Sequence, residues 1–389
     1  MRNKPRIRFK GFTEDWEQHK FNDIVFKQSK ISETELPYVE FEDINSGIGT
    51  LNKDISQKTG HKKGILFEAG DVLFGKLRPY LQNWLLCEFD GIAVGDFWVL
   101  RPQSVTSKFL YYLIQSEAYQ SVANISSGTK MPRSNWTLVS ETSFSIPKYE
   151  ESRMIGEFFS FIDKTITLHQ RKLEKLKLAK KALLQKLFPK NGSQFPEIRF
   201  KGFTDTWEQR KLGDLYKRVN ERNDGTLGKD KWISVAKMYF QDPDKVQSNN
   251  LDTRTYVMKK GDIAFEGHPN NEFKFGRFVL NDIGTGIISE LFPIYRPITE
   301  YDLDFWKYAI QLERVMAPIF AKSITSSGNS SNKLDHNHFL NQELLVPNIE
   351  EQKKIGSLLS ILNKNITLHQ RKLDRLQEVK KGLLQKMFV

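Results

Sequence analysis

Few residue groups in this sequence have the types and spacing that catalysis or metal binding requires. The stretch Gly70 to Lys76, GDVLFGK, has the glycines and the lysine of a phosphate-binding loop. However, Leu77 follows where the Ser or Thr that contacts magnesium would stand. His336 and His338 could bind a metal, but no third ligand lies at a suitable spacing. We therefore predict no catalytic residue and no metal site.

A metal-dependent nuclease is the alternative from the enzyme class. Pro243 and Asp244, taken with Glu272 to Lys274, supply the carboxylates and the lysine of a loose nuclease pattern. The other half of the chain lacks this pattern. Cleavage of DNA by the purified chain with Mg²⁺ alone would support the alternative.

Polar loops stand at matching places in the two halves of the chain. The first half has GKLRP (Gly75 to Pro79) and SSGTKMPRSNW (Ser126 to Trp136), and the second has EGHPNNEFKFGR (Glu266 to Arg277) and TSSGNSSNK (Thr325 to Lys333). Arg pairs with guanine and Asn with adenine, while Ser, Thr and Lys contact phosphate. Any single residue of these loops could equally be ordinary surface. The candidate DNA-contacting residues are Lys76, Arg78, Ser127, Thr129, Lys130, Arg133, Asn135, His268, Asn270, Asn271, Lys274, Arg277, Ser327, Asn329, Asn332 and Lys333.

These loops belong to a duplicated plan. The stretch Ile7 to Lys20 returns as Ile198 to Lys211 with eleven of fourteen residues identical, and Glu151 to Phe188 returns as Glu351 to Phe388 with twenty-one of thirty-eight identical. Between these constant segments the halves diverge almost completely. A shared plan with diverged sequences is what two readers of different targets would show.

The two longer constant segments have the repeat of coiled-coil helices. Apolar residues recur every 3.5 residues over more than four heptads, which is the coiled-coil period. The predicted interface residues are Ile155, Phe159, Ile162, Ile166, His169, Leu173, Leu176, Leu183 and Leu187, with Ile355, Leu359, Leu362, Ile366, His369, Leu373, Leu376, Leu383 and Met387. Lys180 and Lys380 continue the two stripes at polar positions. One such helix cannot bury its stripe alone, so each is the natural partner of the other.

The chain connectivity favours antiparallel pairing. The first helix leaves the first variable region and leads to the second region, whereas the second helix leaves the second region. We therefore predict a pseudo-twofold axis across the middle of the pair, near Arg171. The octapeptide ITLHQRKL, identical at Ile166 to Leu173 and Ile366 to Leu373, would meet its own copy at this axis. Recent duplication with little drift is the other explanation of this identity.

The variable regions read as mixed α/β structure. Strand-like runs include Leu36 to Ile44, Asp71 to Leu77 and Gly91 to Pro102, and a helix-like run covers Ser107 to Ala123. The second half repeats this order, with a helix-like run over Asp304 to Ala321. The predicted fold class is mixed α/β, with two variable domains separated by an antiparallel two-helix coiled coil of pseudo-twofold symmetry.

The composition agrees with an intracellular protein that has a polyanionic partner. The sequence has one cysteine, so it forms no internal disulfide, and it shows neither a signal peptide nor an apolar run long enough to span a membrane. The net charge is +12, of which the two coil segments carry +11. Nucleic acid is therefore the first partner to consider, and a cytoplasmic location is expected.

The layout resembles the specificity (S) subunits of bacterial type I restriction–modification enzymes. The alternation of variable and constant segments, the FKGFT openings with WEQ two residues later, and the helix ends KKALLQKLF and KKGLLQKMF carry the resemblance over the whole chain. It implies two target-recognition domains, at 1–150 and, with a linker, at 189–350. The central and distal conserved helices would be 151–188 and 351–389.

The resemblance also implies partners and cofactors. Each domain would read one half of a bipartite site in double-stranded DNA, and the coil would set the gap between the halves. Two methyltransferase (M) subunits would carry S-adenosylmethionine for adenine N6 methylation, and two restriction (R) subunits would use ATP and Mg²⁺. The chain itself would hold no cofactor and would be non-catalytic. The remaining alternative is a coiled-coil adaptor that bridges two protein partners.

Overall fold

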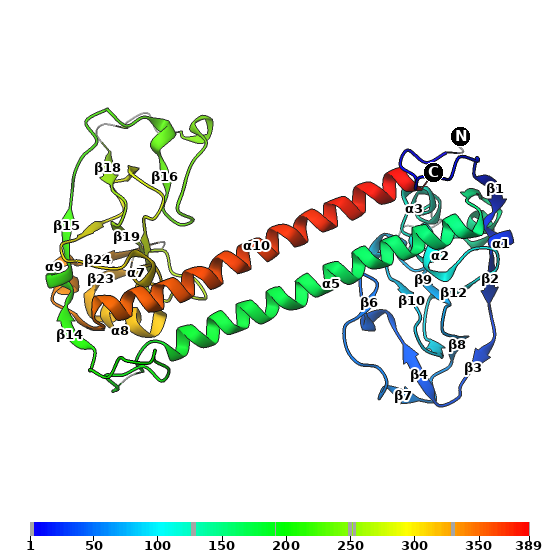
Figure 1. Ribbon diagram of the computed structural model, residues 1–389, viewed down its shortest axis with the longest axis horizontal. Coiled ribbons are helices and arrows are strands. Elements are labelled where there is room, and N and C mark those ends of the chain that lie inside the picture. The colour runs from blue at the N-terminus through cyan, green and yellow to red at the C-terminus, as the bar shows by residue number, and fades with distance from the viewer. Residues whose placement is uncertain are drawn as a thin grey trace. The chain divides into compact units, whose positions relative to one another are not determined.

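The computed structural model describes residues 4–125, 130–190, 192–247, 251, 254–327 and 331–388 of the 389-residue chain. It divides into two compact units, Met1–Arg171 with His369–Val389, and Lys172–Leu368. The boundary passes through the two long helices, so each unit holds one domain and part of both helices (Figure 1). Within the described residues, no helix is long and apolar enough to cross a membrane.

The first unit is built from short strands and short helices around an aromatic core. Phe21, Phe74, Phe97 and Tyr119 are almost completely buried. The strands are β1 (Glu17–Lys20), β2 (Val25–Gln28), β3 (Ile31–Ser32), β4 (Leu36–Val39), β5 (Ile44–Asn45), β6 (Thr50–Leu51), β7 (Thr59–Gly60), β8 (Gly64–Phe67), β9 (Val72–Gly75), β10 (Trp84–Leu86), β11 (Gly91–Ala93), β12 (Phe97–Pro102) and β13 (Ser143–Ile146). The helices are α1 (Phe21–Ile24), α2 (Ser107–Leu113), α3 (Glu117–Ala123), α4 (Trp136–Glu141) and the start of α5 (Tyr149–Lys186), with 3₁₀ turns η1 (Phe41–Asp43) and η2 (Pro79–Leu81).

Two sheets carry most of this domain. One has the strand order β10-β9-β12-β2 and the other β3-β8-β11-β4-β7, while β1 pairs antiparallel with β13 next to the long helix. In the first sheet β9 pairs antiparallel with β10 on one side and β12 on the other, with all four of its residues buried. The loop from β9 to β10 therefore leaves the sheet from a fixed, central strand.

The second unit repeats the plan. Its strands are β14 (Glu208–Lys211), β15 (Tyr216–Val219), β16 (Ile233–Ser234), β17 (Tyr239–Phe240), β18 (Thr255–Met258), β19 (Ile263–Glu266), β20 (Arg277–Leu280), β21 (Gly286–Ser289), β22 (Ile294–Pro297), β23 (Ile324–Ser327), β24 (Asn332–Leu334) and β25 (Glu343–Val346). Its helices are α6 (Leu212–Leu215), α7 (Leu303–Ala309), α8 (Glu313–Ser323), α9 (His336–Leu340) and α10 (Ile349–Met387), with 3₁₀ turns η3 (Lys229–Lys231) and η4 (Pro243–Lys245). The sheet β15-β22-β19-β20 has the same pairing as β2-β12-β9-β10.

The mixed α/β fold with two long helices is confirmed, but the shorter helices differ from expectation. The single helix expected over Ser107 to Ala123 is two helices, α2 and α3. Ser116 interrupts them because its hydroxyl accepts from the backbone N–H of Tyr119 at 3.3 Å, as an N-cap does. The run Asp304 to Ala321 is likewise divided into α7 and α8.

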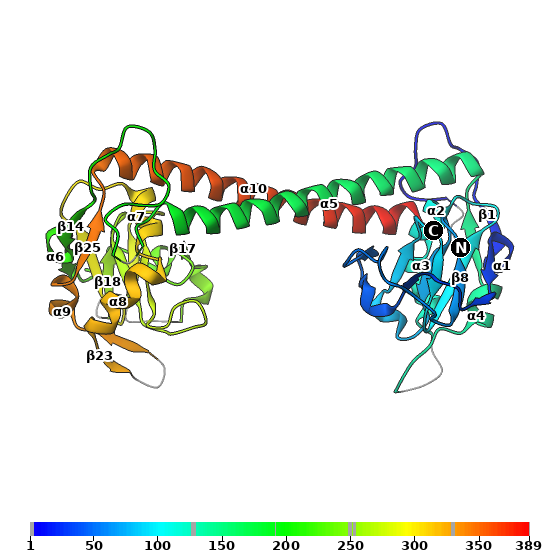
Figure 2. The ribbon, with the colours of Figure 1, turned by 90° about the horizontal axis from the view of Figure 1, so that it is seen from below.

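In each unit the long helices α5 and α10 lie side by side and antiparallel (Figures 1 and 2). In the first unit the His169 and His369 rings meet with their Nδ1 atoms 2.8 Å apart, and Lys380 forms an ion pair with Asp163 at 2.7 Å. In the second unit Lys180 donates to the amide oxygen of Asn363 at 2.7 Å. An offset of 200 residues relates the Lys380–Asp163 contact to the Lys180–Asn363 contact. The two contacts are therefore pseudo-symmetric counterparts. The acceptor is the carboxylate of Asp163 in the first and the side-chain amide of Asn363 in the second.

The repeated opening segments fasten each domain to the helices. Arg8 donates twice to the buried Glu151, at 2.6 and 2.7 Å, and Arg199 donates twice to Glu351, at 2.7 Å each. Bidentate pairs of this kind fix orientation as well as distance. The constancy of these segments thus has a physical basis in two matched clamps.

The same segments also cap the helix ends. The backbone N–H groups of Arg6 and Ile7 donate to the carbonyl of Lys386, and the N–H of Ile198 donates to that of Lys186. These bonds satisfy carbonyls that a helix C-terminus leaves free. In the first unit this junction brings the two ends of the described chain together, whereas in the second it is covalently continuous.

Candidate nucleic-acid interface

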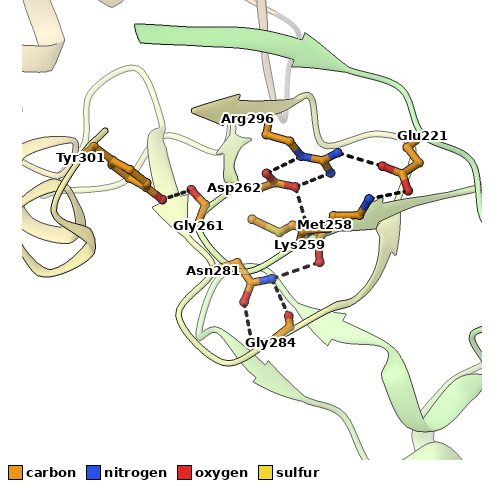
Figure 3. Close-up of polar contacts among 9 residues, drawn as sticks. All are labelled: Glu221, Met258, Lys259, Gly261, Asp262, Asn281, Gly284, Arg296 and Tyr301. Atoms are coloured by element: carbon orange, nitrogen blue, oxygen red, sulfur yellow. Dashed lines mark hydrogen bonds and ion pairs between the residues drawn. The ribbon is translucent and has the colours of Figure 1, made fainter. Parts of the chain in front are cut away.

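In both domains an ion pair with a buried carboxylate fixes the start of the strand that leads to a candidate loop. Asp262 accepts two bonds from Arg296, both at 2.8 Å, and the backbone N–H of Lys259 at 2.8 Å (Figure 3). Arg296 also donates to Glu221, so one guanidinium on β22 joins the turn before β19 to the segment after β15. In the first domain Asp71 accepts from Arg101 at 2.8 and 2.9 Å. The Gly-Asp and Arg-Pro dipeptides that recur in the two domains thus form the same ion pair in each.

The GDVLFGK stretch (Gly70 to Lys76) is mostly strand rather than loop. Val72–Gly75 is strand β9, paired on both sides, rather than a loop with free backbone N–H groups. A phosphate-binding loop needs such groups to surround the phosphates. The stretch therefore has a scaffold role in the sheet.

In the first domain, backbone hydrogen bonds join the two candidate loops. The N–H of Ser134 donates to the carbonyl of Lys76 at 2.9 Å, and the N–H of Arg78 donates to that of Pro132 at 2.7 Å. The loop after β9 and the loop before α4, separated by some fifty residues of sequence, therefore form one surface. Ser127 and Thr129 lie outside the described residues.

One carboxylate organises two of the cations on this surface. Asp96 accepts from Arg133 at 2.9 Å and lies 3.5 Å from the ammonium of Lys76. The hydrogen bond from Arg133, and then the charge of Lys76, lower the pKa of Asp96 below its ordinary value. The side chains of Arg78 and Lys130 are exposed to solvent. Asn135 differs in that its side chain caps helix α4, accepting from the N–H of Leu138 at 3.4 Å.

The second domain has the corresponding surface. The loop between β19 and β20 exposes His268, Asn270, Asn271 and Lys274. The N–H of Asn332, in the β23–β24 hairpin, donates to the carbonyl of Gly267 at 2.8 Å, so the two candidate loops again adjoin. Lys333 is exposed beside Asn332, and Ser327 is the last residue of β23. The side chain of Ser327 and all of Asn329 lie outside the described part of the chain.

Two candidates of the second domain are engaged internally. Arg277 lies within β20 and donates to Glu266 at 2.8 Å and to the carbonyl of Ala236 at 2.7 Å. Asn270 accepts with its side-chain oxygen from the N–H groups of Glu272 and Phe273, at 2.8 and 3.0 Å. Both residues therefore shape the loop, and their side chains are less available for a base edge than residue type alone suggests.

The helix positions predicted from the 3.5-residue repeat lie in α5 and α10, except Leu187, which follows the last residue of α5. Ile155, Phe159, Ile355 and Leu359 are at most 1% exposed, and the other positions are buried or half-buried. The helices begin two residues before the predicted boundaries, at Tyr149 and Ile349.

Sequence reasoning missed the polar partners of the stripe. Asp163 and Asn363 bind Lys380 and Lys180, and the Arg8–Glu151 and Arg199–Glu351 clamps join domain to helix. The clamps could have been found from the sequence, because all four residues recur at equivalent places in the constant segments.

The residues of the nuclease alternative have separate surroundings. Asp244 lies in the 3₁₀ turn η4, while Glu272 and Lys274 belong to the loop before β20, where the N–H of Lys274 donates to Glu313. His336 accepts a hydrogen bond from Arg218, and the N–H of His338 donates to Asp335 at the start of α9. Over the described ranges, no three His, Cys, Asp or Glu side chains are grouped so as to hold a metal ion.

The sequence is similar to proteins of known family. Residues 13–178 match the family model described as the type I restriction modification DNA specificity domain. The chain is 21% identical over 413 residues to the type I restriction enzyme MjaVIII specificity subunit of Methanocaldococcus jannaschii, covering 95% of this chain and 91% of that protein.

Solved structures share the fold. The S subunit of a type I restriction–modification system from M. genitalium aligns with a TM-score of 0.60 at 14% identity, covering 99% of both chains. A chain from a study of complex assembly and conformational transition in a type I restriction–modification system aligns with a TM-score of 0.51 at 17% identity, covering 95% of this chain and 96% of that one. The first half of the chain therefore matches a type I restriction modification DNA specificity domain, and the chain as a whole is similar to specificity subunits of type I restriction–modification systems.

Proposed function

We propose that this chain reads a bipartite sequence in double-stranded DNA, one half with each domain. The observation that carries the proposal is the duplication of one surface with different residues. In both domains a loop from the central strand pair adjoins a second loop through backbone bonds, and both loops expose cations or amides. Because the loop pairs stand at equivalent places in the two domains, both domains would approach DNA in the same orientation. Their different side chains would then give each domain its own base preference.

The two long helices are proposed to serve assembly and spacing. Their constant sequences, in contrast to the domains, suit a partner that is the same for every target. We infer that M subunits carrying S-adenosylmethionine dock there and methylate adenine N6, and that R subunits using ATP and Mg²⁺ join for cleavage. The chain contributes recognition, and the chemistry belongs to its partners.

The decisive experiment is to express the chain with its M subunit in a host that lacks other adenine methylation, and to map methylated adenines across the genome. We expect one bipartite motif. Exchanging the loop residues 76–83 should change one half of the motif and leave the other unchanged. A motif without two separable halves, or a loop exchange that alters both halves, would contradict one-domain, one-half reading.

A further inference from the structure

An apolar tip stands out in the basic surface of the first domain. Tyr80 and Leu81, in the loop between β9 and β10, are 58% and 43% exposed. Met131 and Ile48, on two adjoining loops, are 51% and 46% exposed. We call Ile48, Tyr80, Leu81 and Met131 the apolar tip. The loops that carry these residues are joined by backbone hydrogen bonds, from Gly47 to Gln82 and from Arg78 to Pro132, and large apolar side chains exposed on adjoining loops are candidates for a binding surface.

The backbone beneath the tip is held in an unusual conformation. Arg78 and Gln82, on either side of Pro79–Leu81, have φ angles of 49° and 59°, in the left-handed region that residues other than glycine rarely adopt. The N–H of Leu81 donates to Arg78, that of Gln82 to Pro79, and that of Gly47 to Gln82, at 2.8 to 2.9 Å. Strain of this kind persists where the surroundings impose it, and it clusters at functional sites.

A rigid tip needs little ordering when it binds. Pro79 is buried and holds the 3₁₀ turn against the domain. The side chains of Tyr80 and Leu81 are therefore already exposed before any ligand binds. Preorganised apolar contacts of this kind contribute more to affinity than flexible ones, because less conformational entropy is lost.

The charges around the tip indicate its occupant. Lys76, Arg78, Lys130 and Arg133 lie on the same two loops, and Asp96 is the carboxylate that two of them share. A protein segment that covered the tip would have to leave these cations at the interface. Duplex DNA satisfies both features, since its phosphates neutralise cations and its bases offer flat apolar faces a short distance away.

We propose that Tyr80 and Leu81 form a wedge that enters the first half-site and partly unstacks one base step. The proposal rests on the DNA-reading function above and deepens it. Flanking cations hold the two phosphate strands while the wedge contacts base faces, so the first half-site is read partly through its ease of deformation. Steps that unstack easily, such as a pyrimidine followed by a purine, are the expected contacts.

The described part of the equivalent loop in the second domain has a different set of exposed side chains, so this domain serves as an internal control. Its equivalent loop between β19 and β20 exposes His268, Asn270 and Asn271 instead. Phe275, near the end of that loop, packs against the hydrophobic core and is only partly exposed. Deformation is therefore expected in the first half-site and absent from the second.

The test uses the full chain and duplexes of the mapped motif with 2-aminopurine at successive positions, the methylated adenine excepted. Binding should raise the fluorescence at one step of the first half-site and at none of the second. Tyr80→Ser and Leu81→Ala should abolish the rise and weaken binding about tenfold, the scale of one lost base–aromatic contact. Tyr80→Phe should retain both, because the ring and not the hydroxyl contacts the base.

One control variant and three outcomes separate the possible failures. Ile31→Ser, which alters a residue 61% exposed on β3, should leave fluorescence and affinity unchanged. Fluorescence that stays flat throughout the first half-site, with sequence preference intact, overturns the wedge but leaves the proposed function standing. If the unaltered full chain showed no sequence preference for either half-site, the proposed DNA-reading function itself would be wrong. If Tyr80→Ser weakened assembly with the M subunit in the absence of DNA, the tip would be a protein contact and the proposal wrong.

Discussion

Asp96 neutralises part of the positive charge on the proposed DNA-reading surface of the first domain. It binds Arg133 and lies close to Lys76, and the unaltered chain must loosen these contacts before both cations can bind phosphate. We predict that Asp96→Asn tightens binding to any DNA and steepens its salt dependence, because each cation engaged with phosphate adds about one unit to the salt slope. Affinities of matched and unrelated duplexes, measured over a range of salt, check this.

The control is Asp90→Asn, which removes a carboxylate that accepts from the backbone N–H of Ala69, before β9 rather than in the loop after it. It should alter neither affinity nor slope. Weaker binding of the matched duplex alone by Asp96→Asn would show instead that the carboxylate aims the two cations at their targets.

Lys380 and Lys180 occupy equivalent helix positions but differ in partner. Lys380→Met would leave Asp163 without its cation, so the free energy of unfolding should fall by about 1–3 kcal/mol, as for a hydrogen bond to a charged group. Lys180→Met removes a half-buried ammonium whose acceptor is the neutral Asn363, and it should be neutral or stabilising. Chemical denaturation of both variants gives the comparison, and equal losses would contradict it.

The Lys180 effect should depend on pH. Burial lowers the pKa of Lys180 below its ordinary value of 10.5, so the unfolded chain holds the proton more tightly than the folded one. The penalty is complete at pH values below the lowered pKa and disappears as pH rises toward 10.5. Any advantage of Lys180→Met should therefore shrink between neutral and alkaline pH.

Single site residues were only partly predictable from the sequence. Residue types and Gly- and Pro-rich turns located both loop pairs, and the structure places them side by side. The types did not reveal which side chains are already occupied. Arg277 bonds Glu266 because the β19–β20 register sets the two residues opposite each other. Asn135 caps α4, a six-residue helix whose Trp, Thr, Val and Ser residues give little helix signal in the sequence.

At the scale of elements, the long helices were the most predictable and the strands the least. A 3.5-residue repeat over ten steps is too regular to arise from strands, so α5 and α10 were evident. The strands have two to six residues, and many are buried on both faces, which removes the alternation by which strands are recognised. Buried ion pairs such as Arg296–Asp262 join residues far apart in sequence and leave no local signal.

Helix length should control the spacing of the DNA site. Inserting one apolar-matched heptad in α5 between Gln170 and Arg171, and another in α10 between Gln370 and Arg371, lengthens both helices by about 10 Å. That corresponds to about three base pairs of B-DNA. The unspecified gap in the methylated motif should widen while both half-sites stay the same.

The single insertion in α5 alone is the matched control. It leaves one heptad without a partner, so both melting temperature and methylation should fall. An unaltered gap with full activity in the double insertion would show that the helices do not determine spacing.

At the scale of the whole molecule, the duplication implies that each half is nearly self-sufficient. A fragment from Met1 to Phe188 lacks only a second helix, which another copy of itself could supply. In such a dimer Lys180 of one copy would meet Asp163 of the other, twice. In a dimer of residues 192–388, Lys380 would meet Asn363, twice. We predict that the first fragment dimerises about tenfold more tightly, from the two added ion pairs.

Sedimentation of both fragments over a concentration series measures this difference. With the M subunit, the first fragment should also direct methylation to a palindrome of the first half-site. A monomeric first fragment, or a motif that still contains the second half-site, would contradict the pseudo-twofold relation.

The matched caps at Lys386 and Lys186 make the chain equivalent to a ring with one break. Joining Phe388 to Ile7 through a copy of Pro189–Glu197, and opening the original copy of that segment, would preserve every clamp and cap described above. A circularly permuted chain of this kind should fold, assemble and methylate the same motif. The order of the two readers along the polypeptide is then interchangeable.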